Sequence, residues 1–286
     1  MTIAQAIHQA GERLAEAGVS NARLDAELLF CFAAKKERAW LLSHFKDHAE
    51  QDIIAVFDGL VARRIQREPV QYITGMQEFW GMEFIVTPDV LIPRPETELI
   101  VEACISGVRH NTAPLIIDLC TGSGCIAVSL AKEMPAARIF ATDASGRALT
   151  IARKNAARHG VSGRIRFFEG DLFWPLSELA IRGAVDIIAV NPPYISSADA
   201  AGLQPEVRDY EPKEALVAGA EGTEIQKRII ESALEFLKSG GVLVMEMGIN
   251  QADALKDMIC RSAVFKDPAV LKDLAGIERV IMARRL

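Results

Sequence analysis

The sequence predicts an α/β protein in which a mostly parallel sheet, covered by helices on both faces, follows a small all-α domain. From residue 115 onward, strand-length apolar runs alternate with segments of helical periodicity, the order that produces parallel strands joined by crossover helices. Residues 1–70 instead have apolar side chains at helical spacing and no strand pattern. A length of 286 residues is enough for two such domains.

Composition narrows the class of protein. Half of the residues are hydrophobic and 24% are charged, which provides a sizeable core and excludes global disorder. The net charge of −6 argues against a broad nucleic-acid interface. The sequence has no signal-peptide pattern and no 18-residue apolar run. We therefore expect a cytoplasmic monomer that binds neither nucleic acid directly nor a membrane.

The five cysteines, an odd number, fit reduced and mostly buried thiols. Cys120 and Cys125 share one segment, but no second Cys or His pair stands near them. His44 and His48 are spaced i, i+4 but lack the glutamate of a metalloprotease motif. No metal site is expected.

Residues 1–70 are predicted to form a helical bundle. The apolar residues at helical spacing are Ile3, Ile7, Leu14, Leu24, Leu28, Leu29, Phe32, Leu41 and Leu42. The basic cluster of Arg63, Arg64 and Arg67 is interpreted as a solvated helix face in preference to a binding patch, because charges are on the surface by default.

Residues 71–90 are predicted to form a hairpin linker, since they are rich in aromatic residues and glycine. A third segment, 91–286, opens with a helix running from Pro95 to about Gly107. The acidic Glu96 and Glu98 suit the positive end of that helix. They have two interpretations, a helix cap and a ligand-facing wall.

The rest of the third segment alternates between strands and helices. Strands are expected at 115–119, 138–142, 164–168, 185–190, 241–246 and 278–283. Helices are expected at 124–133, 146–159, 223–238 and 250–261. This order predicts a mostly parallel sheet with helices on both faces.

The first of these strands ends in a tight turn that resembles a nucleotide-binding turn. Gly122 and Gly124 permit sharp turning and the close approach of a ligand. However, Asp118 precedes the turn, and Ala127 stands where a dinucleotide fingerprint has its third glycine. A carboxylate there would repel a pyrophosphate but would suit a cationic amino group, such as that of S-adenosylmethionine (SAM).

Two more strand ends have an acidic residue. Asp143 ends the second strand at the place where Rossmann-type folds bind ribose hydroxyls with a carboxylate. Asp171 follows the third strand and is placed to meet the adenine edge. The order of these strand ends, more than any one of them, indicates a cofactor site.

The fourth strand, Val185 to Val190, stops at Asn191-Pro192-Pro193-Tyr194. Two consecutive prolines cannot continue a ladder of hydrogen bonds, so the loop is rigid. The Asn191 side chain, the Pro192 carbonyl and the Tyr194 ring suit a flat amino group: two acceptors for its protons and a π-face beside it. The other interpretation is a structural turn with a buried tyrosine.

Taken together, the motifs resemble the HemK/PrmC family of protein-(glutamine-N(5)) methyltransferases that modify peptide chain release factors, over nearly the whole chain. The shared motifs are Arg67-Glu68-Pro69-x-Gln71-Tyr72-Ile73-x-Gly75, Ile92-Pro93-Arg94-Pro95-Glu96-Thr97-Glu98, the turn from Asp118 to Gly124, Asn191-Pro192-Pro193-Tyr194-Ile195, Glu211-Pro212 with Ala215-Leu216, and Glu246-x-Gly248-x-x-Gln251. The Asn-Pro-Pro-Tyr motif alone is shared with adenine amino methyltransferases. The Pro-Arg-Pro-Glu-Thr-Glu segment and the helical N-terminal domain are more specific to the glutamine enzymes.

The resemblance implies a Rossmann-like, SAM-dependent methyltransferase sheet in residues 91–286. It implies that residues 1–70 recognise the protein substrate, a class 1 release factor with a Gly-Gly-Gln loop. The residues implied in SAM binding are Asp118, Cys120, Thr121, Gly122, Ser123, Gly124, Asp143, Asp171, Leu172 and Asn191. Those implied in holding the substrate glutamine are Asn191, Pro192, Pro193 and Tyr194, of which Asn191, Pro192 and Tyr194 are the catalytic candidates.

Two departures from the family pattern are visible. Cys120 stands where the family usually has glycine, so the turn must accommodate a Cβ. Ala218-Gly219-Ala220-Glu221-Gly222 replaces the usual Gly-Gly-x-Asp-Gly. Neither departure touches the Asn-Pro-Pro-Tyr loop.

Two other functions are weighed against this one. A nucleic-acid amino methyltransferase would use the same loop but should have a basic domain. A nicotinamide-binding or non-catalytic Rossmann protein is disfavoured by the missing third glycine and by the intact Asn-Pro-Pro-Tyr loop.

Overall fold

The structure is a computed structural model that describes residues 1–107 and 113–286. The chain separates into two compact units. The first comprises Met1–Met76 together with Gln204–Tyr210, and the second comprises Gln77–Leu203 together with Glu211–Leu286. The segment Gln204–Tyr210 of the first unit is thus far in sequence from the segment Met1–Met76. No helix in the described part of the chain is long and apolar enough to cross a membrane.

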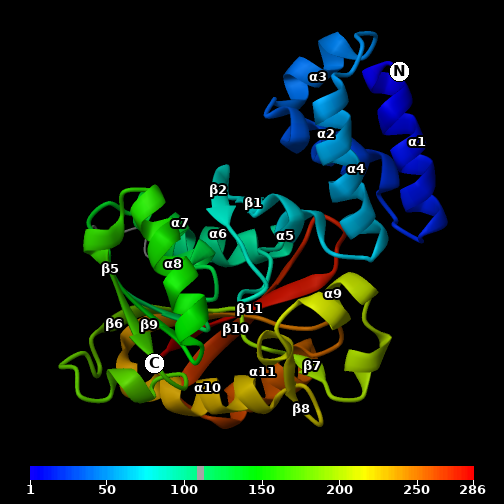
Figure 1. Cartoon of the computed structure of the whole chain (residues 1–286). Helices are drawn as coiled ribbons and strands as arrows, with labels where there is room; N and C mark the ends of the chain where they lie inside the picture. Colours follow the sequence, from blue (N-terminus) through cyan, green and yellow to red (C-terminus); the bar gives the residue numbers. More distant parts are fainter. Residues whose placement is uncertain (108–112) are drawn as a thin grey trace. The chain divides into compact units, whose positions relative to one another are not determined.

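The first unit is built from helices, as predicted (Figure 1). They are α1 (Ile3–Glu16), α2 (Ala22–Ala34), α3 (Arg38–His44), α4 (Gln51–Ile65), α5 (Val70–Thr74) and the remote α9 (Pro205–Tyr210). Thr2 and Gln5 form a capping box at the start of α1, in which each side chain bonds the other's backbone N–H. Apolar side chains of α1, α2 and α4 form the core of this unit.

The helical periodicity identified the core of this unit only in part. Ile3, Ile7, Leu14, Leu29 and Leu41 are buried. Three other residues with the same spacing are exposed: Leu24, Phe32 and Leu42. In α2 apolar residues surround most of the helix, so one set of them faces solvent whichever face is packed.

The interpretation of the basic cluster as a solvated face is wrong for two of its three residues. Arg64 is buried and pairs with Asp25 and with Glu206 of α9, both at 2.8 Å. Arg67 holds the same Glu206 through two nitrogens, at 2.8 and 2.6 Å. Only Arg63 is largely exposed, and it pairs with Glu68. The partner carboxylate of Arg64 and Arg67 lies about 140 residues further along the chain, so no local pattern could reveal it.

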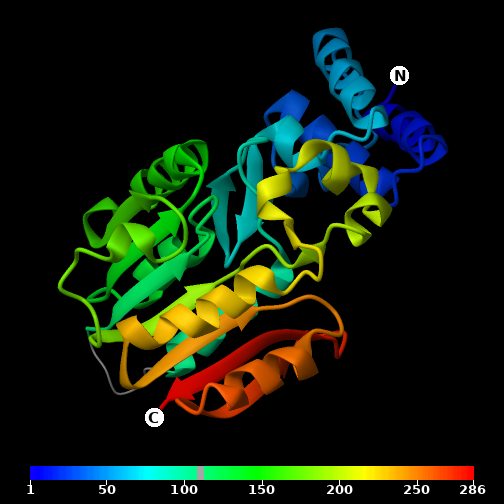
Figure 2. The same cartoon turned by 90° about the horizontal axis from the view of Figure 1, so that it is seen from below.

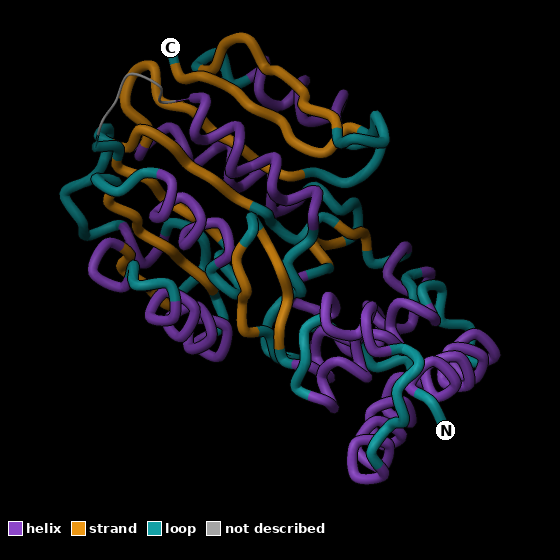
Figure 3. The backbone as a smooth tube through the Cα atoms, turned by 90° about the horizontal axis from the view of Figure 1, so that it is seen from above, coloured by secondary structure: helices purple, strands orange, loops and turns teal. Residues whose placement is uncertain are grey.

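The second unit contains the predicted sheet, with seven strands in the order β10-β11-β9-β6-β3-β4-β5. Its strands are β3 (Leu115–Leu119), β4 (Arg138–Asp143), β5 (Ile165–Glu169), β6 (Val185–Val190), β9 (Leu237–Glu246), β10 (Phe265–Lys272) and β11 (Glu278–Arg285). The five strands from β9 to β5 run parallel, and β11 and β10 are antiparallel additions at one edge. Figure 3 shows these strands side by side.

Helices cover both faces of the sheet, as Figure 1 shows. They are α6 (Glu98–Gly107), α7 (Cys125–Glu133), α8 (Gly146–Arg158), α10 (Glu224–Phe236) and α11 (Ala252–Arg261). Helices α6, α7 and α8 pack on the face of the sheet that includes Ile116. Helices α10 and α11 pack on the opposite face, which includes Ile117. Neighbouring residues of β3 therefore belong to opposite cores, which is why this strand is apolar throughout except for Asp118.

The hairpin consists of β1 (Met76–Phe79) and β2 (Met82–Ile85), and beyond Met76 it belongs to the second unit. Phe79 and Phe84 are buried in the core that includes α6 and α7. The Trp80 N–H donates to the Glu98 carboxylate at 2.7 Å, which ties the hairpin to the start of α6. The helix expected from Pro95 begins as a 3₁₀ turn, Pro95–Thr97, and continues as α6.

Short elements at the edges were not predicted. The strand β10 contains Pro268, which usually argues against a strand. Here β10 pairs only with β11, at the edge of the sheet, and its register shifts between Lys266 and Ala269. The two-stranded pair of β7 (Ile195–Ser196) and β8 (Val217–Gly219) is too short to produce a periodic pattern. Figure 2 shows β10 and β11 next to α11.

Candidate functional site

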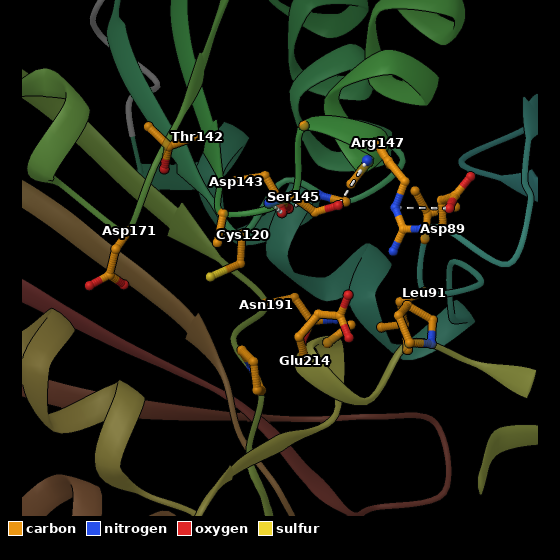
Figure 4. A pocket seen from close by; sticks show the side chains of 18 of the residues that line it. Asp89, Leu91, Cys120, Thr142, Asp143, Ser145, Arg147, Asp171, Asn191 and Glu214 are labelled. Atoms are coloured by element: carbon orange, nitrogen blue, oxygen red, sulfur yellow. Dashed lines mark hydrogen bonds and ion pairs between the residues drawn. The ribbon is translucent and has the colours of Figure 1, made fainter. Parts of the chain in front are cut away.

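A cavity of about 550 Å³ lies at the carboxyl ends of the central parallel strands, a size typical of small-molecule sites. β3 pairs with β4 on one side and with β6 on the other, so the order of connection reverses at β3. Open α/β sheets bind ligands at this point. The lining residues include Asp89, Leu91, Cys120, Gly122, Asp143, Ser145, Arg147, Asp171, Leu172, Asn191, Pro193, Glu214 and Ile225. Figure 4 shows Cys120, Asp143 and Asn191 meeting at this cavity from three strand ends.

The turn after β3 supplies one wall. Gly122 and Gly124 both have positive φ, at 55° and 81°, a conformation that glycine adopts without strain. A Cβ on Gly124 would lie 3.1 Å from the Cβ of Ala152, so this glycine also permits the close approach of α8. Cys120 adopts φ = 54° and keeps its Cβ in the left-handed region, which costs about 1–2 kcal/mol. The departure from glycine is thus accommodated with backbone strain.

Asp143 is held rigidly at the end of β4. One carboxylate oxygen accepts the Gly122 N–H at 2.8 Å and the other accepts the Ser145 N–H at 2.9 Å. The Ser145 hydroxyl in turn caps α8 by accepting the Ala148 N–H. Burial raises the pKa of Asp143, and the two backbone hydrogen bonds oppose that rise. Each oxygen retains a free lone pair, so the carboxylate can still accept two ligand hydroxyls.

Asp118, Thr121 and Ser123 are buried beneath the turn and are absent from the cavity lining. The Asp118 carboxylate accepts the Thr121 hydroxyl at 2.5 Å. Burial raises its pKa to about 7, against the effect of the Thr121 hydrogen bond. These side chains shape the turn from below, and direct contact of Asp118 with a ligand stays a prediction.

The third acidic strand end is more open. The Asp171 side chain is 60% exposed, forms an ion pair with Arg228 of α10, and lines the cavity beside Leu172. Leu172 is buried and has φ = 45°. A carboxylate and an apolar side chain adjacent to each other suit a flat ring with polar edges.

The Asn-Pro-Pro-Tyr loop forms the opposite wall. Asn191 and Pro193 line the cavity, whereas Pro192 and Tyr194 do not. The Tyr194 hydroxyl donates to the buried Glu246 at 3.2 Å, and the Tyr194 carbonyl accepts the side-chain amide of Gln251 at 3.0 Å. The loop is therefore anchored on the side away from the cavity.

Glycines behind the loop explain part of the altered 218–222 segment. A Cβ on Gly222 would stand 2.8 Å from the Tyr194 carbonyl oxygen. A Cβ on Gly248 would stand 3.2 Å from the Tyr194 ring. The retained Gly222 is thus the position where a side chain would displace the loop. The two changed residues, Ala218 and Glu221, lie in β8 and in the turn after it, respectively.

Residues 91–98 contribute both a wall and supports. Leu91 lines the cavity, and Arg94 pairs with the buried Glu211 at 2.5 Å. Glu211 precedes Pro212 and Glu214, which also line the cavity. Glu96 and Glu98 lie in the first turns of the 3₁₀ segment and α6 and do not line the cavity, which favours the helix-start interpretation for these two residues.

Several residues that line the cavity were not predicted from the sequence. Asp89 lies in the part interpreted as a linker, yet it lines the cavity and stands 3.4 Å from Arg147. Ser145 follows Asp143 and could have been recognised as a helix cap. Glu214 lies between Glu211-Pro212 and Ala215-Leu216 of a shared motif but was not itself singled out, and Ile225 belongs to α10, which carries no motif.

The charges of the lining favour a cationic ligand. Four carboxylates, those of Asp89, Asp143, Asp171 and Glu214, line the cavity together with a single arginine, Arg147. Negative charge at this density would repel a pyrophosphate but attracts an ammonium or sulfonium group. The residues therefore fit SAM better than a nicotinamide dinucleotide.

Comparison with known proteins gives consistent results for both units. Residues 5–75 match the family model described as the PrmC N-terminal domain, and residues 97–204 match the methyltransferase small domain. A release factor glutamine methyltransferase of Geobacter sulfurreducens is 45% identical over 95% of this chain and 92% of its own length. One from Koribacter versatilis is 40% identical over 100% of this chain and 99% of its own length.

Similarity to solved structures extends to more distant methyltransferases. The catalytic domain of human METTL16 in complex with an RNA hairpin aligns with a TM-score of 0.58 and 19% identity, over 74% of this chain and 79% of that one. Its N-terminal domain in complex with SAH aligns with a TM-score of 0.54 and 18% identity, over 71% and 76% of the two chains. At this identity the likeness extends to the Rossmann-like fold alone, which confirms the predicted fold class.

Proposed function

The chain belongs to the family of release factor glutamine methyltransferases, and from this premise we propose the methyl donor, the acceptor atom and the residues that hold them. It transfers a methyl group from SAM to the side-chain amide nitrogen of the glutamine in the Gly-Gly-Gln motif of peptide chain release factors. The observation that best supports this function is that Asn191 and Asp143 line one cavity. An acceptor for a substrate amide and a carboxylate for a ribose are thus next to each other.

The cofactor would be held by the turn from Cys120 to Gly124, by Asp143, and by Asp171 with Leu172. When bound, SAM supplies an electrophilic methyl group on a positively charged sulfur. Asp143 would accept the ribose hydroxyls with its free lone pairs, and Asp171 and Leu172 would border the adenine. Cys120 stays a neutral thiol, because burial raises its pKa.

Asn191 and Pro192 act on the substrate nitrogen. A carboxamide nitrogen is a poor nucleophile, because its lone pair is delocalised into the carbonyl group. The Asn191 side-chain oxygen and the Pro192 carbonyl accept its two protons, and this favours a pyramidal nitrogen with a directed lone pair. The gain is mostly positioning, together with electrostatic stabilisation of the positive charge that develops on nitrogen. The Tyr194 ring, which does not itself line the cavity, would border the amide of a bound substrate. No strong base is needed before transfer, because the extra proton can leave the methylated nitrogen afterwards.

The first unit recognises the folded release factor. It contains none of the cavity residues, and it exposes apolar side chains of α2, Leu24 and Phe32, at 40% and 46%. A protein substrate can bury such side chains, whereas a small cofactor has no use for them. The enzyme acts as a cytoplasmic monomer that contacts neither nucleic acid nor membrane.

Mass spectrometry of a release factor incubated with the enzyme and SAM tests the proposed function. The expected product has one added methyl group, and fragmentation places it on the glutamine of the Gly-Gly-Gln motif. A release factor with alanine in place of that glutamine is the matched control and should stay unmodified. Methylation elsewhere, or transfer to adenine amino groups of nucleic acid in its place, would contradict the proposal.

A further inference from the structure

A chain of three hydrogen bonds runs from the proposed catalytic amide into the core of the second unit. The Asn191 side-chain nitrogen donates to the Thr97 hydroxyl at 3.2 Å, and Thr97 donates to the Glu246 carboxylate at 2.7 Å. The other Glu246 oxygen accepts the Tyr194 hydroxyl at 3.2 Å. Thr97 and Glu246 are 1% and 2% exposed.

The fold places these residues next to each other although they are far apart in sequence. Val190 of β6 pairs with Met245 of β9, so Asn191 and Glu246 follow at the same end of neighbouring parallel strands. Thr97 ends the 3₁₀ turn of the Pro-Arg-Pro-Glu-Thr-Glu segment. Because Thr97 and Glu246 are almost completely buried and do not line the cavity, neither side chain is expected to touch the substrate.

We propose that Thr97 and Glu246 are positioning residues that set which end of the Asn191 amide faces the substrate. The inference rests on the proposed function. An ionised carboxylate can only accept hydrogen bonds, so the single Thr97 proton goes to Glu246. The Thr97 oxygen can then only accept, and Asn191 must turn its NH₂ group toward it. The Asn191 oxygen is left to accept a proton of the substrate amide.

Reversing the Asn191 amide would place its oxygen against the Thr97 oxygen with no proton between them. A buried polar group left without its partner disfavours a state by about 10–100-fold. Without the Thr97 hydroxyl, the productive orientation leaves the Asn191 NH₂ group without a partner on the core side and carries that penalty. The reversed amide turns the NH₂ group toward the cavity, where it presents a donor to a substrate that is itself a donor. The chain therefore selects the productive orientation.

The orientation depends on the charge of Glu246. Burial raises the pKa of Glu246 to about 7, and the nearby charge of Glu96 adds to the rise. Hydrogen bonds from Thr97 and Tyr194 and the charge of Arg279 oppose it. Once protonated, Glu246 can donate a hydrogen bond to the Thr97 oxygen. The Thr97 hydroxyl proton is then free to bond the Asn191 side-chain oxygen, which holds the amide in the reversed orientation. Methyl transfer should thus decline as the pH falls through about 7.

Of the titratable groups near Glu246, Tyr194 and Cys125 do not account for such a decline, whereas Asp118 could contribute to it. Burial raises the pKa of Tyr194 and, to about 12, that of Cys125, so neither ionises near neutral pH. Asp118, under the neighbouring turn, also has a pKa raised to about 7 by burial. The wild-type pH profile alone therefore cannot assign the decline to Glu246, and a variant is needed.

Single-turnover methyl transfer to a release factor, at saturating SAM, tests the proposal with two matched substitutions. Thr97→Val removes the hydroxyl at nearly constant shape and should slow transfer about 10–100-fold, with a SAM dissociation constant within a few-fold of wild type. Thr97→Ser keeps the hydroxyl and should stay within a few-fold of the wild-type rate. A Thr97→Val enzyme that transfers at the wild-type rate would overturn the proposal.

A second variant distinguishes orientation from mere structural support. The glutamine side chain in Glu246→Gln can accept a hydrogen bond from Thr97 and donate one to Tyr194, but it does not titrate. The variant should therefore lose the part of the decline in transfer rate at low pH that is due to protonation of Glu246. An unchanged decline in folded Glu246→Gln contradicts the inference, even if Thr97→Val does not fold. If wild type itself fails to methylate release factors, it is the proposed function that fails.

Discussion

Asn191 is the proposed catalytic residue, and its side chain both lines the cavity and donates a hydrogen bond to Thr97. Asn191→Ala deletes the proposed acceptor and leaves the two prolines to keep the shape of the loop. The transfer rate should fall by roughly 10²–10³, about 2.7–4 kcal/mol, as for the loss of one preorganised group from an active site. The SAM dissociation constant should change only a few-fold. Single-turnover rates at saturating SAM, on variants whose unfolding is normal, measure this.

Asn191→Asp is the matched companion, because it keeps an acceptor and loses the NH₂ group that donates to Thr97. Two acceptors would then compete for the Thr97 proton, and a second carboxylate would stand near the buried Glu246. We expect partial activity, between that of wild type and that of Asn191→Ala. Wild-type rates in Asn191→Ala would reduce the loop to a structural turn.

Asp143 is expected to act on cofactor affinity and not on the transfer step. Charge-assisted hydrogen bonds contribute about 1.5–3 kcal/mol each, so Asp143→Ala should weaken SAM binding by about tenfold or more. Turnover at saturating SAM should change less. Calorimetric titration with SAM measures the affinity. Asp253→Asn, which changes a fully exposed carboxylate outside the cavity lining, serves as a control that should bind like wild type. An unchanged dissociation constant in Asp143→Ala would remove this residue from the site.

Sequence reasoning identified the residues at strand ends better than those that support them. Asn191 directly follows β6, Asp143 ends β4 and Asp171 lies two residues after β5, so the strand pattern also locates them at one edge of the sheet. Thr97 and Glu246 stood in recognisable motifs, but their hydrogen bond joins positions 149 residues apart. A contact of that kind depends on strand order, which local patterns do not contain.

At the scale of elements, α9 shows how a short helix can belong to a distant part of the chain. It follows the Asn-Pro-Pro-Tyr loop by about a dozen residues, yet it is part of the first unit, where Glu206 bonds Arg64 and Arg67. The chain enters α9 from the second unit and returns to it at Glu211, the partner of Arg94. The connection between β7 and β8 is thus fastened at both of these points.

The ion pairs of α9 should make the first unit sensitive to acid. Hydrogen bonds from Arg67 and Arg64 outweigh the opposing effect of burial and lower the pKa of Glu206 from 4.5 to about 2. A lowered pKa in the folded state means a stabilisation that is complete above about 4.5 and is lost as the pH falls toward 2. Glu206→Gln should therefore lower the Tm at pH 7 and flatten its decline in acid.

Thermal unfolding between pH 3 and 7 measures this effect. Breaking one side of a buried ion pair costs about 3 kcal/mol when no bond remains, and glutamine, which keeps one acceptor, should cost less. The exposed Glu16→Gln is the control, with a Tm close to wild type at every pH. An equal Tm for Glu206→Gln and wild type at pH 7 would show that α9 is held by other contacts.

The elements themselves were predictable where they are buried and periodic. The strands β3 and β6 have their predicted bounds, because both are apolar on both faces and end at turn-forming residues. Prediction failed for β10, whose Pro268 is tolerated only because the strand lies at an edge with a shifted register. Whether a strand lies at an edge follows from the order of the whole sheet and not from the strand's own residues.

At the scale of the whole molecule, we propose that the division into two units separates the recognition of a protein from the chemistry on one of its side chains. The cavity uses residues of the second unit only. Deleting residues 1–70 would be an unclear test of that division, because it would also remove Arg64 and Arg67 from Glu206. The structure allows a milder test on the surface of α2, where Leu24 and Phe32 are exposed eight residues apart.

Replacing Leu24 and Phe32 together by serine should weaken recognition of the intact release factor and leave the chemistry unchanged. Burying an apolar side chain at an interface contributes about 1.5–3 kcal/mol, so we expect the KM for intact release factor to rise at least tenfold. The rate with a short peptide that contains the Gly-Gly-Gln motif should stay at the wild-type value, because such a peptide is too short to need a second contact surface. The control is Leu274→Ser in the second unit, a residue that is also exposed and apolar. Steady-state kinetics with both substrates test this prediction. An equal loss of activity with the peptide would indicate damage to the enzyme as a whole. An unchanged KM for intact release factor would show that α2 is not the recognition surface.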